Sequence, residues 1–209
     1  MKITCSNIGK KFQGQWIFSG FNFEFSSKSK TGIIGFNGSG KSTLISILSG
    51  YSTPTKGEIH FIDGQSAIEK EKVFQLCSIG APYIDVPEEL SPREIISTFS
   101  SFKPFINNAT AIEILEMLRL KKDADKSVKY FSSGMKQRLK IGMAILSDCP
   151  LLLLDEPLSN LDKDGIDWFN ELMLDYSQSK TIIVASNNIP EELKFCDKIL
   201  DISDYKIAN

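Results

Sequence analysis

Short apolar runs and alternating apolar positions along the chain predict a series of strands. The clearest alternation places Phe21, Phe23 and Phe25 on one face of a strand over 16–25. Residues 2–5 are predicted to pair with that strand as a small antiparallel sheet. The remaining predicted strands lie at 31–34, 57–64, 74–79, 151–154, 181–185 and 198–202.

Apolar residues at helical spacing predict helices between these strands. Ser91 is expected to cap a helix that has Pro92 at its first position and Glu94 in a capping box. Further helices are predicted over 41–48, over about 109–120, from about 132 through 145, and up to about 177. Strands and helices alternate except at about 83–130, where helices prevail. The pattern therefore predicts one α/β domain, 1–209, with a helical insert at about 83–130.

Composition narrows the class of protein. The chain has 209 residues, of which 42% are hydrophobic and 24% charged, enough to bury one substantial core. A net charge of −2 leaves no basic surplus, so nucleic acid is not an expected partner. No signal peptide is evident, and no apolar run approaches the roughly 18 residues of a spanning helix. The cysteines are widely spread, which favours reduced thiols over a disulfide framework or metal site: Cys5, Cys77, Cys149 and Cys196.

The nonapeptide at 35–43, Gly-Phe-Asn-Gly-Ser-Gly-Lys-Ser-Thr, fits the phosphate-loop pattern at every fixed position. A predicted strand precedes it and a predicted helix follows, so an accidental Gly-rich turn is a poor alternative. Lys41 is expected to contact the β and γ phosphates, and Ser42 to bind Mg²⁺ through its hydroxyl. The residues predicted to bind the nucleotide here are Gly35, Asn37, Gly38, Ser39, Gly40, Lys41, Ser42 and Thr43.

Two carboxylates follow the four leucines at 151–154, which read as a buried parallel strand. Such a strand delivers its last residues to the carboxyl edge of the sheet, where ligands bind in these folds. We expect Asp155 to hold Mg²⁺, directly or through water, and Glu156 to orient or deprotonate the attacking water. Small polar residues at 132–134 open another helix and form a second anion-binding terminus, although a plain N-cap explains Ser132 equally well.

Taken together, the motifs resemble the ATP-binding subunits of ABC transporters over nearly the whole chain. They are the phosphate loop, Ser-Ser-Gly-Met-Lys-Gln-Arg at 132–138, the strand ending in Asp155 and Glu156, and Ser-Asn-Leu-Asp at 159–162. The resemblance implies a P-loop NTPase core with a mostly parallel sheet, an N-terminal antiparallel β subdomain and an inserted α-helical subdomain. It also implies that ATP and Mg²⁺ are bound.

The same resemblance implies a head-to-tail pair of subunits, either two copies or this chain with a related one. Ser132, Ser133 and Gly134 of one subunit would close over ATP held by the phosphate loop of the other. Asp162 would lie at the seam of the dimer. Phe12 takes the position of the aromatic residue that stacks on adenine, with Trp16 as the alternative.

Two positions depart from the family's pattern, and both concern hydrolysis. The family's magnesium-contacting glutamine falls at Pro82 or a neighbour, and proline has no side-chain donor and no N–H. Gln75 is expected in the preceding strand, too far upstream to replace it. The family's switch histidine falls on Asn187, whose amide can donate a hydrogen bond to a γ-phosphate but cannot carry a proton charge. We therefore expect hydrolysis to persist, but slowly.

The function implied by the resemblance is ATP-driven transport through a separate integral membrane subunit. The protein would then be cytoplasmic and peripheral on the inner face of the membrane, with the helical insert as its coupling surface. Two alternatives stay open: a soluble ABC-type ATPase acting on ribosomes or DNA, and a catalytically weakened regulatory partner. A simple P-loop kinase leaves Ser132 to Gly134 and Asp162 unexplained.

Overall fold

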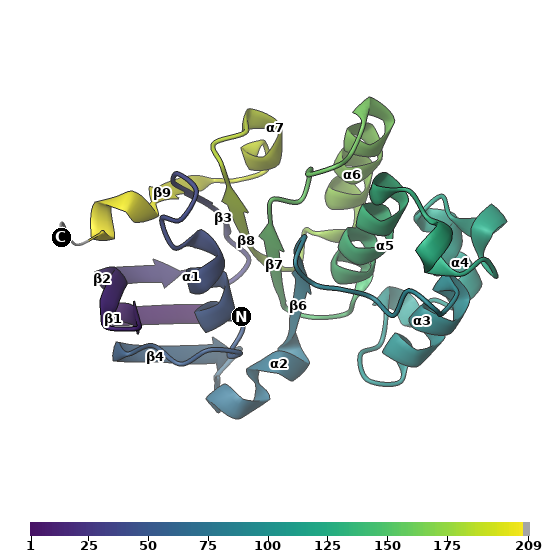
Figure 1. Ribbon diagram of the computed structural model, residues 1–209. Coiled ribbons are helices and arrows are strands. Elements are labelled where there is room, and N and C mark those ends of the chain that lie inside the picture. Colours follow the sequence, from purple (N-terminus) through teal and green to yellow (C-terminus); the bar gives the residue numbers. More distant parts are fainter. Residues whose placement is uncertain (207–209) are drawn as a thin grey trace.

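The structure is a computed structural model that describes residues 1–206, and it contains two sheets with helices between and beside them (Figure 1). The last three residues of the predicted domain 1–209 lie outside the described residues. The four-stranded sheet is antiparallel and has the order β2-β1-β4-β5. The five-stranded sheet has the order β6-β7-β8-β3-β9, and every one of its pairs is parallel.

The strands follow the chain in a simple order. In the described residues they are β1 Lys2–Phe12, β2 Gln15–Phe25, β3 Lys30–Ile34, β4 Lys56–Asp63, β5 Ser66–Ile68, β6 Cys77–Gly80, β7 Leu151–Asp155, β8 Thr181–Ser186 and β9 Lys198–Asp201. The α-helices are α1 Lys41–Leu48, α2 Val73–Leu76, α3 Pro92–Ser100, α4 Ala111–Met117, α5 Ser133–Leu146, α6 Lys163–Tyr176 and α7 Pro190–Leu193. Short 3₁₀ turns complete the set at Lys70–Lys72, Ile106–Asn108, Lys121–Asp123, Val128–Tyr130 and Ile202–Tyr205.

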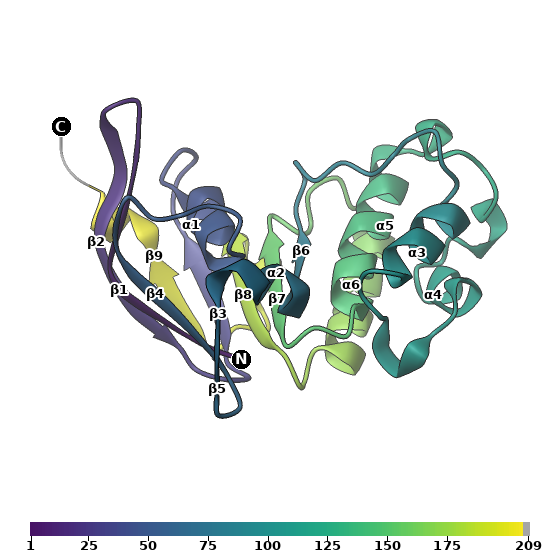
Figure 2. The same cartoon turned by 90° about the horizontal axis from the view of Figure 1, so that it is seen from below.

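The elements form layers that Figure 2 shows from below. Helix α1 lies between the antiparallel sheet and the parallel sheet, and α5 and α6 cover the other face of the parallel sheet. Helices α3 and α4 lie beyond α5, at the far side from the antiparallel sheet. Two apolar clusters match these layers, because one surrounds α1 between the sheets and the other joins α5 and α6 to α3 and α4. Both faces of the parallel sheet are therefore buried, as its leucine-rich β7 predicts.

The predicted fold class is confirmed: the chain has an α/β core, an N-terminal antiparallel sheet and a helical segment. That segment contains α3, α4 and the 3₁₀ turns between Ile106 and Tyr130. Helix α3 begins with the predicted capping box between Ser91 and Glu94. Among residues 1–206, no helix combines the length and apolar character needed to cross a membrane.

The strand predicted at 74–79 is wrong in its first half. Val73–Leu76 is a short helix, and only Cys77–Gly80 pairs with β7. Val73 is buried while Phe74 is 59% exposed, so this apolar run packs on one side as a helical turn does. Gln75 therefore lies in α2 and not in the strand. A run of six residues is too short for periodicity to separate the two structures.

Other element boundaries shift for local reasons. Strand β1 extends beyond the predicted 2–5 to Phe12, and it turns into β2 through Gln13 and Gly14, both with positive φ. Phe12 thus ends a strand instead of lying in a connecting loop. Helix α4 begins later than predicted because Thr110 caps it through a box with Glu113.

Candidate functional site

The phosphate-loop sequence forms a tight turn between β3 and α1. Gly35 and Gly40 have φ of 152° and 108°. A Cβ on Gly35 would lie 2.5 Å from Ser39 Oγ, and one on Gly40 would lie 2.9 Å from both Ile17 and Phe18 side chains. Glycine is therefore required at both positions by backbone angle and by space. The loop opens α1 without a side-chain cap or an acidic residue in its first turn, which leaves the N-terminal N–H groups available to an anion.

Lys41 is buried at the centre of this loop and is held by oxygen atoms. Its Nζ donates to the carbonyl oxygens of Gly35 at 2.8 Å and Phe36 at 3.3 Å, and to Asn187 Oδ1 at 2.7 Å. Asn187 Nδ2 in turn donates to Glu156 Oε1 at 2.7 Å. The structure thus brings together three residues predicted from separate motifs. They form one chain of hydrogen bonds across the carboxyl edges of β3, β7 and β8.

Asp155 ends β7 beside this chain, and it is only 2% exposed. Burial raises the pKa of its carboxyl group, the nearby charge of Glu156 adds to the rise, and the Ser42 and Tyr83 hydroxyls oppose it. Neither carboxylate oxygen has a hydrogen-bond partner within residues 1–206. A buried carboxylate without partners is costly, and a cation would relieve that cost.

The residues present fit a Mg²⁺ ion at this place. Asp155 offers two unpartnered oxygen atoms, and the Ser42 hydroxyl lies close enough to lower the pKa of that carboxyl. In the described part of the chain, no cluster of three or more His, Cys, Asp or Glu forms a metal cage of its own. Mg²⁺ does not require one, because it commonly takes one or two protein oxygens together with waters and substrate phosphates.

The residues of the second predicted anion site gather around a different cavity. Ser132 caps α5 by accepting a hydrogen bond from the Met135 N–H at 3.2 Å. Ser132, Ser133, Gly134 and Asp162 line a cavity of about 490 Å³, whereas Gly35, Asn37 and Asn187 line another of about 460 Å³. Asp162 itself caps α6 by accepting from the Gly165 N–H at 2.8 Å. One chain therefore carries two separate groups of predicted nucleotide-binding residues.

Arginines surround the cavity at Ser132, which the sequence analysis did not single out. Arg138 pairs with Asp164 at 2.5 Å and lies 3.8 Å from Asp162, and Arg119 pairs with Asp164 at 3.1 Å. The Arg138 guanidinium also lies over the Trp168 ring. Both arginines line this cavity, and both are paired with Asp164.

Phe12, the predicted stacking residue, projects at the end of β1. It is 52% exposed, and the Lys10 ammonium lies 5.0 Å from its ring centre. Trp16, the alternative, is more buried and has Lys11 over its ring at 5.6 Å. The more exposed ring at Phe12 has the free surface that stacking on a base needs.

The turn after β6, where the sequence lacks the family's glutamine, brings a tyrosine near the acidic site. Residues Ala81 to Ile84 form a turn closed by the Ile84 N–H and the Ala81 carbonyl at 3.2 Å, and Lys140 of α5 donates to the Pro82 carbonyl at 2.9 Å. Tyr83 follows Pro82 and faces Asp155, and both burial and that carboxylate raise the pKa of its hydroxyl. Tyr83 lies near Asp155 because β6, which precedes this turn, pairs in parallel with β7, which ends at Asp155.

Two buried side chains hold the loop between β7 and α6, and the sequence analysis missed both. Gln137 of α5 donates to the Pro157 carbonyl at 3.2 Å, and Glu192 of α7 accepts from the Leu158 N–H at 3.1 Å. Burial raises the pKa of Glu192, and the charges of Glu156 and Asp155 add to the rise while Ser186 and the Leu158 N–H oppose it. Residues 191–192 look like an ordinary acidic first turn in the sequence, so no signal there marked Glu192 as buried.

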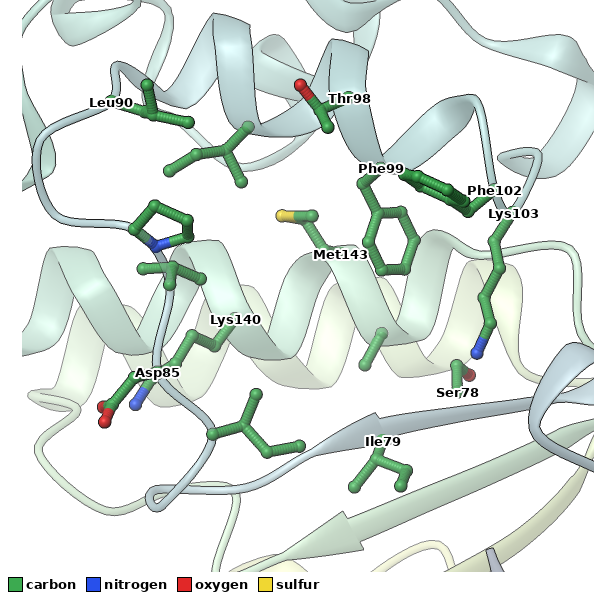
Figure 3. Close-up of a pocket in the computed structure, with 15 residues that line it drawn as sticks. Ser78, Ile79, Asp85, Leu90, Thr98, Phe99, Phe102, Lys103, Lys140 and Met143 are labelled. Carbon is green, nitrogen blue, oxygen red and sulfur yellow. The ribbon is translucent and has the colours of Figure 1, made fainter. Parts of the chain in front are cut away.

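An apolar groove of about 450 Å³ runs beside the Pro82 turn, between β6, α5 and α3. Figure 3 shows Phe99 and Met143 pointing toward one another across it, with Ile79 on the sheet side. Charged groups lie at its edge, with Asp85 next to Lys140 at one end and Lys103 at the other. Phe102, which also lines the groove, is 83% exposed. Such an exposed apolar surface with a polar rim is typical of an interaction site.

Known proteins are similar to this chain in sequence and in fold. The sequence profile of the family described as ABC transporter matches residues 18–159. An uncharacterized ABC transporter ATP-binding protein, YcbN of Bacillus subtilis (strain 168), is 31% identical over 98% of this chain and 67% of its own length. The cytochrome c biogenesis ATP-binding export protein CcmA of Brucella abortus (strain 2308) is 30% identical over 91% of this chain and 86% of its own.

A solved structure confirms the fold without adding to the function. The putative ABC transporter ATP-binding protein from Pyrococcus furiosus superposes with a TM-score of 0.81 at 21% identity, covering 99% of this chain and 100% of its own. At that identity the likeness concerns the fold alone. The chain spans about two thirds of the length of the Bacillus protein.

Proposed function

The chain belongs to the ABC transporter family, and from that membership we propose that it is the ATP-hydrolysing subunit that drives transport through a separate integral membrane subunit. The observation that carries the proposal is the hydrogen-bonded chain from Lys41 through Asn187 to Glu156. It joins the phosphate loop to an acid beside the buried Asp155. Phosphate binding and water activation need those groups at one place.

Nucleotide binding is assigned to the loop at 35–43 together with the end of β1. The backbone N–H groups of the loop and the Lys41 ammonium would bind the phosphates, and Phe12 would stack on the adenine. Ser42 and Asp155 would hold Mg²⁺, which neutralises phosphate charge when bound. The Lys41 ammonium has only three donors and all of them are engaged, so it must exchange one of these bonds for a phosphate oxygen. We assign the exchange to the bond with Asn187, because a side-chain acceptor can turn away while the two carbonyl groups belong to the loop itself.

Water activation is assigned to Glu156, with Asn187 as its neighbour. Glu156 would accept a proton from the attacking water, while the amide of Asn187 would donate to the γ-phosphate. A neutral amide supplies a hydrogen bond but no full positive charge, and Pro82 supplies no donor at all. We therefore propose that turnover is slow, although the groups for it are present.

The second group of residues, at the cavity of Ser132, would serve the nucleotide of another subunit. Ser132, Ser133 and Gly134 at the N-terminus of α5 form an anion site, and no phosphate loop of the same chain lines their cavity. A head-to-tail dimer would place each of these sites over the other subunit's phosphate loop, with Asp162 at the seam. ATP would then close the dimer, and hydrolysis would reopen it.

The membrane subunit is proposed to dock at the apolar groove of Figure 3. The groove is lined by Ile84 and Asp85, which directly follow the Tyr83 that lies near Asp155, so a partner bound there would contact a segment continuous with the metal site. Its apolar floor and charged rim match the composition of protein interfaces. The protein would accordingly act at the cytoplasmic face of a membrane.

A comparison of the wild type with Glu156→Gln tests hydrolysis directly. We expect the variant to bind Mg²⁺ and ATP, to release phosphate at least about a hundredfold more slowly, and to elute as a dimer with ATP. Glu191→Gln, at an exposed acid, should behave as the wild type. Equal phosphate release by wild type and Glu156→Gln, with ATP still bound, would instead identify a regulatory nucleotide-binding partner.

Docking is tested by isolating the chain from native membranes. A multi-span protein should co-purify with the wild type, and Phe102→Asp should abolish that association while leaving ATP binding unchanged. Recovery of ribosomes or nucleic acid in place of a membrane protein would support the soluble ATPase.

A further inference from the structure

Three connections join the segment 156–158 to the segment 185–192. The Glu156 N–H donates to the Ala185 carbonyl at 2.9 Å, and the Glu156 carboxylate accepts from Asn187 at 2.7 Å. The third connection is the hydrogen bond of 3.1 Å from the Leu158 N–H to Glu192 Oε1. Of the three, only the last uses a side chain that has no place in the proposed chemistry.

The backbone that these connections hold is strained. Glu156 has a φ of 44°, in the left-handed region that a non-glycine residue rarely adopts. Such a conformation persists where the surrounding structure over-determines it. The bond at the Glu156 N–H and the bond at the Leu158 N–H, two residues further on, hold the main chain of this turn independently of the contact between the Glu156 side chain and Asn187.

Glu192 is an unusual group to find at this place. It is 1% exposed, its Oε1 has the Leu158 N–H as partner, and its Oε2 has none among the described residues. It also lies near the carboxylates of Glu156 and Asp155, which oppose its ionisation. An apolar residue would fill the same space but would leave the buried Leu158 N–H without an acceptor, so the contribution of this side chain is the oxygen that it offers to the loop.

We propose that Glu192 is a positioning residue that, through the Leu158 N–H, sets the place of Glu156 relative to Asn187. This inference rests on the proposed function, because it concerns the same ATP site. The side chain does not touch the nucleotide; it fixes the loop that carries the water-activating carboxylate.

The test compares two neutral replacements of similar length. Glu192→Gln keeps an oxygen that can accept from the Leu158 N–H, whereas Glu192→Met has none. Glu192→Asp retains the charge but withdraws the acceptor by one methylene, which provides a second test if the methionine variant does not fold. Glu191→Gln and Glu191→Met, at the exposed neighbour in the same helix, are matched controls.

We expect Glu192→Met and Glu192→Asp to lower kcat for ATP by at least about tenfold while the Kd for ATP changes less than about twofold. Glu192→Gln should stay within about threefold of the wild type in both, since it keeps the acceptor. The split between kcat and Kd distinguishes positioning from general loss of structure. Equal kcat in Glu192→Met and Glu192→Gln, or a parallel loss of ATP binding, would overturn the inference.

Amide hydrogen exchange separates this inference from the proposed function. The Leu158 and Glu156 amides should exchange faster in Glu192→Met than in Glu192→Gln, with or without nucleotide. If the wild type releases no phosphate, the proposed function fails, and the exchange rates still decide the role of Glu192. Equal exchange at both amides in the two variants would contradict it.

Discussion

Lys41 and Asn187 are 146 positions apart in sequence, and their Nζ and Oδ1 atoms lie 2.7 Å apart. The chemistry of the neighbours fixes the orientation of the amide, because an ammonium only donates and a carboxylate only accepts. Oδ1 must therefore face Lys41, and Nδ2 must face Glu156. The lysine of the phosphate loop is thus bonded to a residue from the other end of its own chain.

Replacing Asn187 should separate nucleotide binding from turnover. Asn187→Ala removes an acceptor that competes with phosphate for Lys41, so ATP affinity should stay equal or rise by up to about tenfold. The same change removes the donor to Glu156 and the γ-phosphate, so kcat should fall by about a hundredfold. Asn187→Asp places a carboxylate beside Glu156 and should weaken ATP binding by at least about tenfold. Nucleotide titration and phosphate release measure both quantities.

The neighbouring Asn188 supplies the control for that series. It is exposed and has a φ of 63°, so Asn188→Gly respects its backbone and removes an amide of the same kind. We expect ATP binding and turnover to stay near the wild type. If Asn187→Ala binds ATP more weakly while Asn188→Gly does not, Asn187 does not compete for Lys41.

Residues with fixed sequence spacing were predictable, and contacts made by tertiary packing were not. The phosphate loop, the Ser91 capping box and the strand ending at Asp155 each depend on neighbours within a few positions, so local rules identify them. Glu192 acquires its role from Leu158, which is 34 positions away, and only folding reveals that pair. The strand predicted at 74–79 failed because a six-residue apolar run fits a strand or a helical turn equally well.

The two hydrogen bonds of Asn187 were predictable only in part. The sequence placed Lys41, Glu156 and Asn187 in one site through the motifs around them. Their hydrogen bonds depend on the parallel order β7-β8-β3, which brings the carboxyl ends of three strands together. That order is a property of the whole sheet, and no local pattern contains it.

Two serine caps give a matched pair for testing the proposed dimer. Ser132 caps α5 and Ser91 caps α3, and each hydroxyl accepts a backbone hydrogen bond. Ser132→Ala and Ser91→Ala should each lower the free energy of unfolding by about 1 kcal/mol. Only Ser132→Ala should also weaken ATP-dependent dimerisation, as measured by sedimentation in a Glu156→Gln background. Equal dimerisation by the two variants would exclude Ser132 from the second nucleotide contact.

Asp155 should reduce the stability of the protein in the absence of ligand. Its carboxylate is buried without hydrogen-bond partners in the described residues, so Asp155→Asn removes a charge whose burial is unfavourable. We expect the free energy of unfolding to rise by about 1 kcal/mol, which corresponds to about 2–4 °C in Tm. The variant should lose the further rise in Tm that Mg²⁺ with ATP gives the wild type. Asp175→Asn, at an exposed site, should change neither the free energy of unfolding nor the rise in Tm with Mg²⁺ and ATP. If Asp155→Asn keeps that rise in Tm, Asp155 does not belong to the metal site.

Lys180 should make stability depend on pH above neutrality. It is 3% exposed and donates to the Ile145 carbonyl at 2.7 Å and to the Ser147 carbonyl, and burial lowers its pKa from 10.5 to about 8. Between these values the unfolded chain keeps a proton that the folded chain has released, so raising the pH favours the folded state. The difference between the free energies of unfolding of the wild type and Lys180→Met should therefore change in favour of the wild type as the pH rises above about 8. Urea titrations should show a slope of up to about 1.4 kcal/mol per pH unit. Lys163→Met removes an exposed lysine and controls for the loss of one positive charge. If the stability difference between wild type and Lys180→Met varies with pH as it does for Lys163→Met, Lys180 keeps its proton in the folded protein.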